Sequence, residues 1–185
     1  MKNIKGTLPN ILTLMNLSLG VIAILLAVNS EGNSSNHLFQ ASLLLLIAAL
    51  TDRFDGKVAR MLDVTSDLGK ELDSLSDLIS FGVAPITVAW KINDFASLGS
   101  VGYLIALIFP IAGAYRLARY NVTSFDNVFR GIPITIAGSF LTITNLYNCN
   151  LITKNRISNI HTTITIVIIV ILSFLMISKI KFKKI

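Results

Sequence analysis

The sequence predicts an all-α, polytopic membrane protein with six transmembrane helices. Hydrophobic residues make up 53% of the 185 residues and charged residues only 14%, whereas a soluble domain usually carries about 25% charged residues. The mean hydropathy is +0.70. The net charge is +6, but the basic residues lie in short groups between apolar stretches and form no basic face with interleaved aromatic residues. This pattern argues against nucleic-acid binding and for a membrane protein.

Each predicted helix is an apolar segment close to the roughly 20 residues that a bilayer requires. The six segments cover about residues 10–28, 37–60, 71–90, 98–119, 131–151 and 160–178. The first follows a basic start, but it is long enough to span a bilayer and no small-residue cleavage site follows it, so we interpret it as a transmembrane helix and not as a signal peptide. Only short polar connectors separate the segments, which predicts a single domain over residues 1–185.

The placement of Lys and Arg predicts the orientation. With six spans, one side receives both termini and the loops after the second and fourth spans, and most of the basic residues lie there. The other side receives only Lys91, Lys154 and Arg156. Because basic residues favour the cytoplasmic side, we expect a protein of the cell membrane with both termini at the cytoplasmic face.

Four aspartates at neighbouring ends of the second and third segments carry the strongest chemical signal. On helices, Asp52 and Asp55 share one face (i, i+3), and Asp73 and Asp77 share another (i, i+4). A carboxylate costs about 3 kcal/mol near the bilayer centre, and neighbouring carboxylates also repel one another. A bound cation removes both penalties. Oxygen ligands without a nearby His or Cys favour Mg²⁺ or Mn²⁺, and two such ions could hold a diphosphate.

Ordinary helix capping or salt bridging is the alternative interpretation of acidic residues at helix ends. We adopt it for Asp63, Asp67 and Glu71, which lie in or beside the connecting loop. Gly56 and Ala59 share the carboxylate face and leave room for a flat base or a diphosphate, although small residues also allow close helix packing. Gly69 precedes the third span, where it can serve a turn. The single cysteine, Cys149, excludes an intrachain disulfide.

With Arg60, these residues complete the pattern D-x-x-D-G-x-x-A-R-x8-G-x3-D-x3-D from Asp52 to Asp77. The sequence therefore resembles the CDP-alcohol phosphatidyltransferase family. The stretches LPNILTLMNLSLG, LDSLSDLISFGVAP, RLARYNV and FRGIPITIAG look like those of its membrane-embedded phosphatidylserine synthase branch. The resemblance covers nearly the whole chain, and its catalytic pattern is more specific than the stretches that bear on the acceptor.

The resemblance implies a role for each residue of the pattern. The metal ligands, for two Mg²⁺ or Mn²⁺ ions, are Asp52, Asp55, Asp73 and Asp77. Asp77 is also the expected general base. Gly56 and Ala59 would face the cytidine nucleotide, Arg60 would help to hold the phosphates, and Gly69 is a further candidate binding residue.

The resemblance also implies the fold and the reaction. The family fold is a six-helix membrane bundle that forms homodimers. The reaction transfers the phosphatidyl group of CDP-diacylglycerol, held in the lipid bilayer, to the hydroxyl of L-serine and gives phosphatidylserine and CMP. Positioning and charge neutralisation would supply most of the catalysis.

The acceptor-binding residues are open to two interpretations. Arg116, Arg119 and Arg130 lie at the predicted cytoplasmic ends of the fourth and fifth spans. They could donate hydrogen bonds to a carboxylate or a phosphate, or they could be positive-inside anchors.

Polar residues of the first span are equally ambiguous. Asn10, Thr13 and Asn16 recur along this helix near its cytoplasmic end. They could line the nucleotide or acceptor pocket, or form hydrogen bonds between helices.

Two other functions remain as alternatives. The same chemistry could use glycerol 3-phosphate or inositol phosphate as the acceptor, which would require a denser basic pocket. Outside the enzymes, a transporter could pass a divalent cation along intramembrane aspartates. Its path would need polar residues across the bilayer, whereas the outer halves of the spans are nearly bare of charge.

Overall fold

A computed structural model describes residues 2–30, 35–61, 66–122, 129–179 and 181–182, with side chains for residues 10–30, 35–54, 66–122 and 131–179. Within these ranges the long elements are all helices, as predicted. The extended elements there are β1 (Phe129–Arg130) and β2 (Lys181–Phe182), which form one short antiparallel pair.

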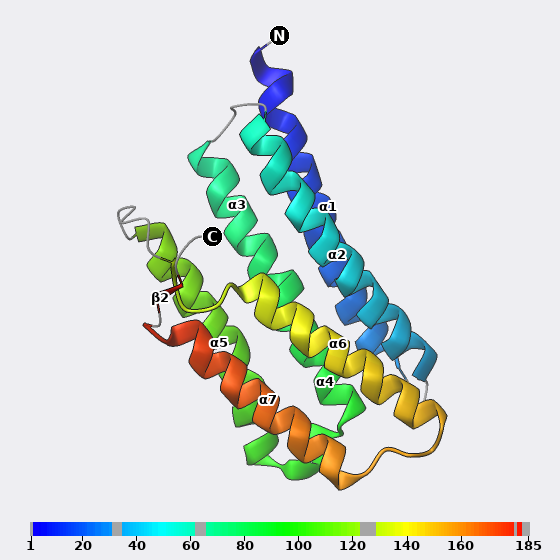
Figure 1. Cartoon of the computed structure of the whole chain (residues 1–185). Coiled ribbons are helices and arrows are strands. Elements are labelled where there is room, and N and C mark those ends of the chain that lie inside the picture. The colour runs from blue at the N-terminus through cyan, green and yellow to red at the C-terminus, as the bar shows by residue number, and fades with distance from the viewer. Residues whose placement is uncertain (1, 31–34, 62–65, 123–128, 180, 183–185) are drawn as a thin grey trace.

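The helices form an elongated bundle (Figure 1). Helices α1 (Lys2–Val28) and α2 (Ser35–Met61) lie side by side along its length. Three elements follow one another without a break and form one continuous helical rod, the third rod of the bundle. They are α3 (Asp67–Asp77), the π-helix η1 (Leu78–Val83) and α4 (Ala84–Ile92). After the 3₁₀ turn η2 (Phe95–Leu98) come α5 (Ser100–Val122), α6 (Ile134–Thr153) and α7 (Asn159–Ile177).

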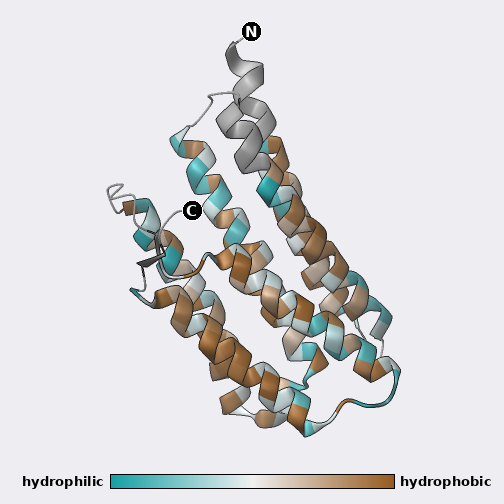
Figure 2. Ribbon diagram, viewed as in Figure 1, coloured by the Kyte–Doolittle hydropathy of each residue, from teal (hydrophilic) through white to brown (hydrophobic). Residues whose placement is uncertain are grey.

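Five helical stretches are long and apolar enough to cross a membrane. They cover residues 10–28, 35–54, 67–92, 100–122 and 159–177, close to five of the predicted segments. Large apolar side chains on their outer faces are exposed, among them Leu104 at 60% and Phe174 at 71%. Brown, apolar residues accordingly cover much of the bundle in Figure 2. Exposure on this scale suits a lipid environment and not water.

Helix α6 is the remaining long helix, but it is not among the helices apolar enough to cross a membrane. The predicted count of six spans therefore stays a prediction. Asn145, Asn148 and Asn150 lower its hydropathy. The first two are buried and bond to neighbouring helices: Asn145 Nδ2 donates to the carbonyl oxygen of Pro85 at 2.9 Å, and Asn148 Nδ2 donates to Thr165 Oγ1 at 3.0 Å. Such bonds between helices stabilise amide N–H groups away from water, so α6 can lie inside a membrane bundle.

The π-helix η1 begins directly after Asp77 and ends just before Pro85. Proline has no N–H, and its ring collides with the carbonyl group four residues earlier in a regular α-helix. Here the backbone N–H of Ala84 bonds to Ile79 O, five residues back. The wider turn therefore accommodates Pro85 without interrupting the rod, and a π-helical turn beside a functional residue is a common arrangement.

Gly138 allows α6 to cross η1 closely. A Cβ atom at this position would overlap the backbone carbonyl and the side chain of Phe81. Phe81 is 1% exposed and belongs to the core that joins η1, α5, α6 and α7. The first half of α6 is thus held against the segment that follows Asp77.

We predict that Gly138→Val destabilises the protein by about 1–3 kcal/mol, because overpacked cores must shift backbone or rotamers. The measurement is thermal unfolding in detergent. Ile143→Phe, which enlarges an exposed side chain of the same helix, should leave the midpoint unchanged. Equal midpoints for Gly138→Val and the unmodified protein would contradict the close crossing.

Candidate metal centre and substrate site

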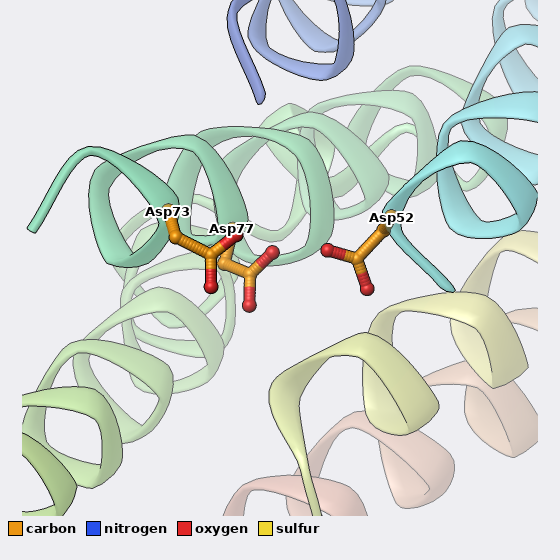
Figure 3. Close-up of side chains that lie close together, drawn as sticks. All are labelled: Asp52, Asp73 and Asp77. Carbon is orange, nitrogen blue, oxygen red and sulfur yellow. The ribbon is translucent and has the colours of Figure 1, made fainter. Parts of the chain in front are cut away.

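Three of the four predicted aspartates converge at one place in the bundle. Asp73 and Asp77 project from α3 toward Asp52 on α2, and the first turns of α6 lie beside them (Figure 3). One carboxylate oxygen from each residue lies within 4.8 Å of the others. Asp77 is only 8% exposed, whereas Asp52 and Asp73 are half-buried. The predicted convergence of carboxylates across a helix pair is therefore confirmed for these residues.

Helical geometry explains how this group forms. Asp73 and Asp77 are one turn apart on α3, so their side chains lie above one another on one face. The N-terminus of α3 is capped by Ser66, whose Oγ accepts a 3.0 Å hydrogen bond from Gly69 N. Asp52 comes from α2, which packs with η1 and α6. The site thus depends on the relative positions of α2, α3 and α6.

The three carboxylates fit a hard divalent cation. Two ligands on opposite sides of one Mg²⁺ lie about 4.2 Å apart, since each bond is about 2.1 Å. The spread of 4.8 Å is therefore within a small side-chain movement of single-ion ligation, or within reach of two bridged ions. The Asp52 carboxyl lies within hydrogen-bond reach of Asp77. Two carboxylates so close repel one another unless a proton or a cation lies between them.

Four residues of the sequence pattern have side chains outside the described residues. They are Asp55, Gly56, Ala59 and Arg60. Their backbone belongs to α2, which continues to Met61, so the helical spacing that relates Asp52 to Asp55 is present. Their ligand and nucleotide roles stay predictions, as does the role of Arg130, whose side chain also lies outside the described residues.

Gly69 lies in the first turn of α3 and not in a bend before it. A Cβ atom at this position would lie 3.0 Å from Ser66 Oγ and 3.2 Å from Asn10 Oδ1. The glycine therefore allows the serine cap and α1 to approach α3. Its binding role stays a prediction.

The polar residues of α1 lie along its contact with α3 and η1. Ser76 Oγ donates to Thr13 O at 3.1 Å, and Ser80 Oγ donates to Asn16 O at 3.0 Å. Asn16 is 1% exposed, and neither atom of its amide has a hydrogen-bond partner among the described residues. Both bonds are accepted by backbone oxygens, so they decide nothing about the side chains of Thr13 and Asn16, and both interpretations stay predictions.

The two arginines of α5 differ in their surroundings. Arg116 is buried, attracts Asp77 electrostatically, and lies with its guanidinium carbon 5.8 Å from the centre of the Tyr120 ring. Its Nε has no hydrogen-bond partner among the described residues. Arg119 instead donates to the carbonyl oxygens of Ile177 at 3.0 Å and Ser178 at 3.4 Å. Arg116 is thus the α5 arginine whose charge interacts with Asp77.

Acidic residues assigned to ordinary helix-end roles behave as expected where they are described. Asp67 forms an exposed ion pair with Lys70 at 3.3 Å. Glu71 is exposed and accepts a 3.4 Å hydrogen bond from Asn121. Asp63 lies outside the described residues.

Thr135 is a site residue that the sequence interpretation missed. It lies in the first turn of α6, with its side chain near the carboxylate of Asp52. The stretch FRGIPITIAG drew attention to this part of the chain only through its resemblance to a family. Nothing in the local pattern indicates that Thr135, 83 positions after Asp52 in the chain, would meet it.

Comparison with known proteins agrees with this geometry. The family model described as CDP-alcohol phosphatidyltransferase matches residues 6–182. A Bacillus subtilis protein named CDP-diacylglycerol–serine O-phosphatidyltransferase is 34% identical over 177 residues, which are 95% of this chain and 89% of that protein.

Proteins of two other organisms carry the same name. The Methanocaldococcus jannaschii protein is 35% identical over 178 residues, 96% of this chain and 74% of its own length. The Helicobacter pylori protein is 39% identical over 132 residues, 70% of this chain and 53% of its own length. A match over nearly the whole chain, together with the gathered aspartates, shows that the protein belongs to the CDP-alcohol phosphatidyltransferase family.

Proposed function

We propose that this protein transfers the phosphatidyl group of CDP-diacylglycerol to the hydroxyl of L-serine, with release of CMP. The observation that carries the proposal is the group formed by Asp52, Asp73 and Asp77 at one site between the helices. The names of relatives that match most of the chain support serine as the acceptor.

The aspartates would hold Mg²⁺ or Mn²⁺, with Asp55 as the fourth ligand expected from the sequence pattern. Two divalent ions bound there would neutralise the diphosphate and stabilise the charge that develops during displacement at phosphorus. The acyl chains of the substrate would remain in the bilayer, beside the exposed apolar faces of the bundle. Gly56, Ala59, Arg60 and Gly69 are the proposed contacts of its nucleotide and phosphates.

The chemical step needs a proton acceptor. The serine hydroxyl oxygen forms a bond to the β-phosphorus while the bond from this phosphorus to the oxygen of CMP breaks. The hydroxyl proton passes to Asp77, the most buried member of the group. A carboxylate is a weak base for an alcohol, so transfer would occur as negative charge is neutralised in the transition state.

Arg116 is the proposed partner of the serine carboxylate. Among the described side chains it is the buried basic residue, and it lies beside Asp77. A buried arginine can hold a carboxylate through two parallel, charge-assisted hydrogen bonds. Arg119 is a weaker candidate for a substrate contact, because its guanidinium donates to the end of α7. Asn10 and Thr13 stay candidates for the nucleotide or acceptor pocket.

The alternatives have less support. The relatives reported above carry names that specify serine, which favours serine over glycerol 3-phosphate and inositol phosphate as the acceptor. A cation transporter would need polar groups along the length of the bundle. The family match and the confinement of the described aspartate group to one place favour an enzyme.

We place the protein in the cell membrane, with both termini and the aspartates on the cytoplasmic side, where a water-soluble acceptor can reach them. The distribution of Lys and Arg supports this orientation. We also propose a homodimer by analogy with the family. A monomeric mass in light scattering of the detergent-solubilised protein would count against the dimer.

The acceptor is tested by supplying purified protein with CDP-diacylglycerol and Mn²⁺ and measuring CMP release. L-serine, glycerol 3-phosphate and inositol phosphate are offered separately. We expect release with serine alone, abolished by a chelator and restored by added Mn²⁺. Release with only a phosphorylated acceptor would overturn the assignment.

Arg116→Gln provides a second arm of the same assay. A lost charge-assisted hydrogen bond of about 1.5–3 kcal/mol corresponds to a KM for serine that is at least about tenfold higher. The matched control is Arg156→Gln, an exposed arginine in the α6–α7 connection, with an unchanged KM. A normal KM in Arg116→Gln would remove Arg116 from the acceptor site.

Asp77→Asn tests the base. We expect turnover to fall by at least about 100-fold, in the range found for the loss of a general base. Binding of the nucleotide should largely survive, because Asp52 and Asp73 can still hold a metal ion. Asp67→Asn, which alters an exposed acid, is the control with normal turnover. Near-normal turnover in Asp77→Asn would show that another group accepts the proton.

The orientation is tested with a membrane-impermeant thiol reagent on intact cells. Cys149 is 1% exposed, so it contributes little background. A cysteine introduced by Lys154→Cys should react from outside, and one introduced by Asp67→Cys should react only after the cells are opened. The opposite pattern would invert the proposed topology.

A further inference from the structure

Helix α1 connects the two helices that carry the aspartates. It packs along α2, which carries Asp52, and also against α3, which carries Asp73 and Asp77 (Figure 1). Within the described residues, α2 and α3 have little direct contact with one another. The distance from Asp52 to the other two aspartates therefore depends strongly on how α3 lies against α1.

Two buried serines bond the third rod to α1. Ser76 lies on α3 and Ser80 on η1, and their hydroxyls donate to the backbone oxygens of Thr13 at 3.1 Å and Asn16 at 3.0 Å. A backbone carbonyl oxygen has two lone pairs, so it can accept a serine hydroxyl in addition to the N–H of its own helix. Helix α1 thus offers two acceptors about one turn apart and keeps its own hydrogen bonds.

The direction of these two bonds differs from that of other buried serines in the bundle. A serine inside a helix commonly donates to the carbonyl group four residues earlier in the same helix. Ser42 and Ser173 do so, with Leu38 and Ile169 as their acceptors. The serines on either side of Asp77 instead donate to a neighbouring helix. Their hydroxyls therefore connect helices at the part of the chain that carries the metal-binding group.

A glycine on α1 allows this close approach. A Cβ atom at Gly20 would lie 2.5 Å from Ser80 Oγ and 2.9 Å from Ser80 Cα, which is too close for a side chain. Small residues let helix backbones approach one another in membrane bundles. Any larger residue at this position would push η1 away from α1.

The serines occupy a different side of the rod from the aspartates. Neighbouring residues of a helix are about 100° apart around its axis, so Ser76 can bond to α1 while Asp77 faces the metal-binding group. A carboxylate oxygen lies about 5 Å from the helix axis, so a rotation of about 10° moves it by about 1 Å. Misplacement by about 1 Å can lower an enzymatic rate about 100-fold. Directional hydrogen bonds resist such a rotation better than apolar contacts, which have no preferred direction.

We propose that Ser76 and Ser80 are positioning residues of the metal centre: their hydrogen bonds to α1 set the rotation of the third rod and hold Asp73 and Asp77 at the correct distance from Asp52. The proposal rests on the proposed function in that the aspartates bind a divalent cation. A functional site requires its groups to be held within about 0.5 Å and 10–20° by supporting residues.

Mn²⁺ binding without substrate tests the proposal. Free Mn²⁺ is measured by electron paramagnetic resonance while detergent-solubilised protein is titrated, at a temperature at which circular dichroism shows each variant to be folded. The double variant Ser76→Ala/Ser80→Ala should weaken binding about tenfold or more, as found for residues that support metal ligands. Affinity equal to that of the unmodified protein would overturn the proposal. Ser76→Ala alone removes one bond, should weaken binding by a smaller factor, and supplies the same test if the double variant does not fold.

A matched control removes a buried hydroxyl that does not connect helices. Ser42→Ala on α2 removes the 2.9 Å hydrogen bond to Leu38 O of the same helix and should leave Mn²⁺ affinity unchanged. An equal loss in Ser42→Ala would show a general effect of removing buried hydroxyls and contradict the proposal. Gly20→Ala tests the α1 side, because it keeps both serines but presses on Ser80. It should also weaken Mn²⁺ binding, and normal affinity would contradict the dependence on α1.

A purely structural role of the serines predicts a different result. In that case Ser76→Ala would lower the midpoint of thermal unfolding but leave the Mn²⁺ affinity and turnover of the folded protein normal, which would overturn the proposal. We expect instead that CMP release by the folded variant requires more Mn²⁺ for half-maximal rate, with an unchanged KM for L-serine.

The same titration separates this proposal from the proposed function. If the unmodified protein binds no Mn²⁺, the proposed metal centre fails, and the positioning role fails with it. If the unmodified protein binds Mn²⁺ and the serine variants bind it equally well, only the positioning role fails.

Discussion

The mutual repulsion of the aspartate carboxylates is the interaction on which the rest of this structure depends. Asp52, Asp73 and Asp77 bring three oxygens within 4.8 Å of one another between membrane-spanning helices. Such a group is unfavourable without a cation, because like charges repel one another and partial burial reduces their screening by water. The bundle must therefore hold the carboxylates together against their repulsion, and that requirement explains features that are otherwise unrelated.

Three of these features lie around the aspartates. The π-helical turn after Asp77 accommodates Pro85 and keeps the third rod continuous. Gly138 lets α6 approach this turn, so that the start of α6, with Thr135, lies near Asp52. Arg116 places a positive charge beside Asp77 from the α5 side. Helices α2, α3, α5 and α6 thus each contribute to one centre, and a rigid scaffold of this kind suits catalysis by positioning.

Much of the fold was predictable because a bilayer imposes length and polarity on each span. Five of the predicted segments match helices long and apolar enough to cross a membrane. Helix α6 is less clear because its buried asparagines, which bond to Pro85 and Thr165, lower its hydropathy, and hydropathy cannot distinguish a buried, hydrogen-bonded amide group from an exposed one. The turn at Leu78–Val83 depends on both Pro85 and the packing of α6, so periodicity alone could not predict it.

The part of the candidate site that depends on spacing along the chain was also predictable. Spacing on one helix relates Asp73 to Asp77, and the fixed pattern connects them to Asp52. Contacts between distant segments were not accessible, such as the approach of the start of α6, with Thr135, to Asp52. Arg119 looked equivalent to Arg116 in the sequence, yet it bonds to the end of α7. The roles of side chains that depend on tertiary contacts can be identified only once the fold is known.

The most direct test of the account is a crystal structure with Mn²⁺ and CDP-diacylglycerol, with anomalous scattering used to locate the metal. We predict an anomalous peak within coordination distance of carboxylate oxygens of Asp52, Asp73 and Asp77, with the diphosphate bound beside it. A fully occupied substrate whose diphosphate lies away from these residues, with no metal between them, would contradict the account.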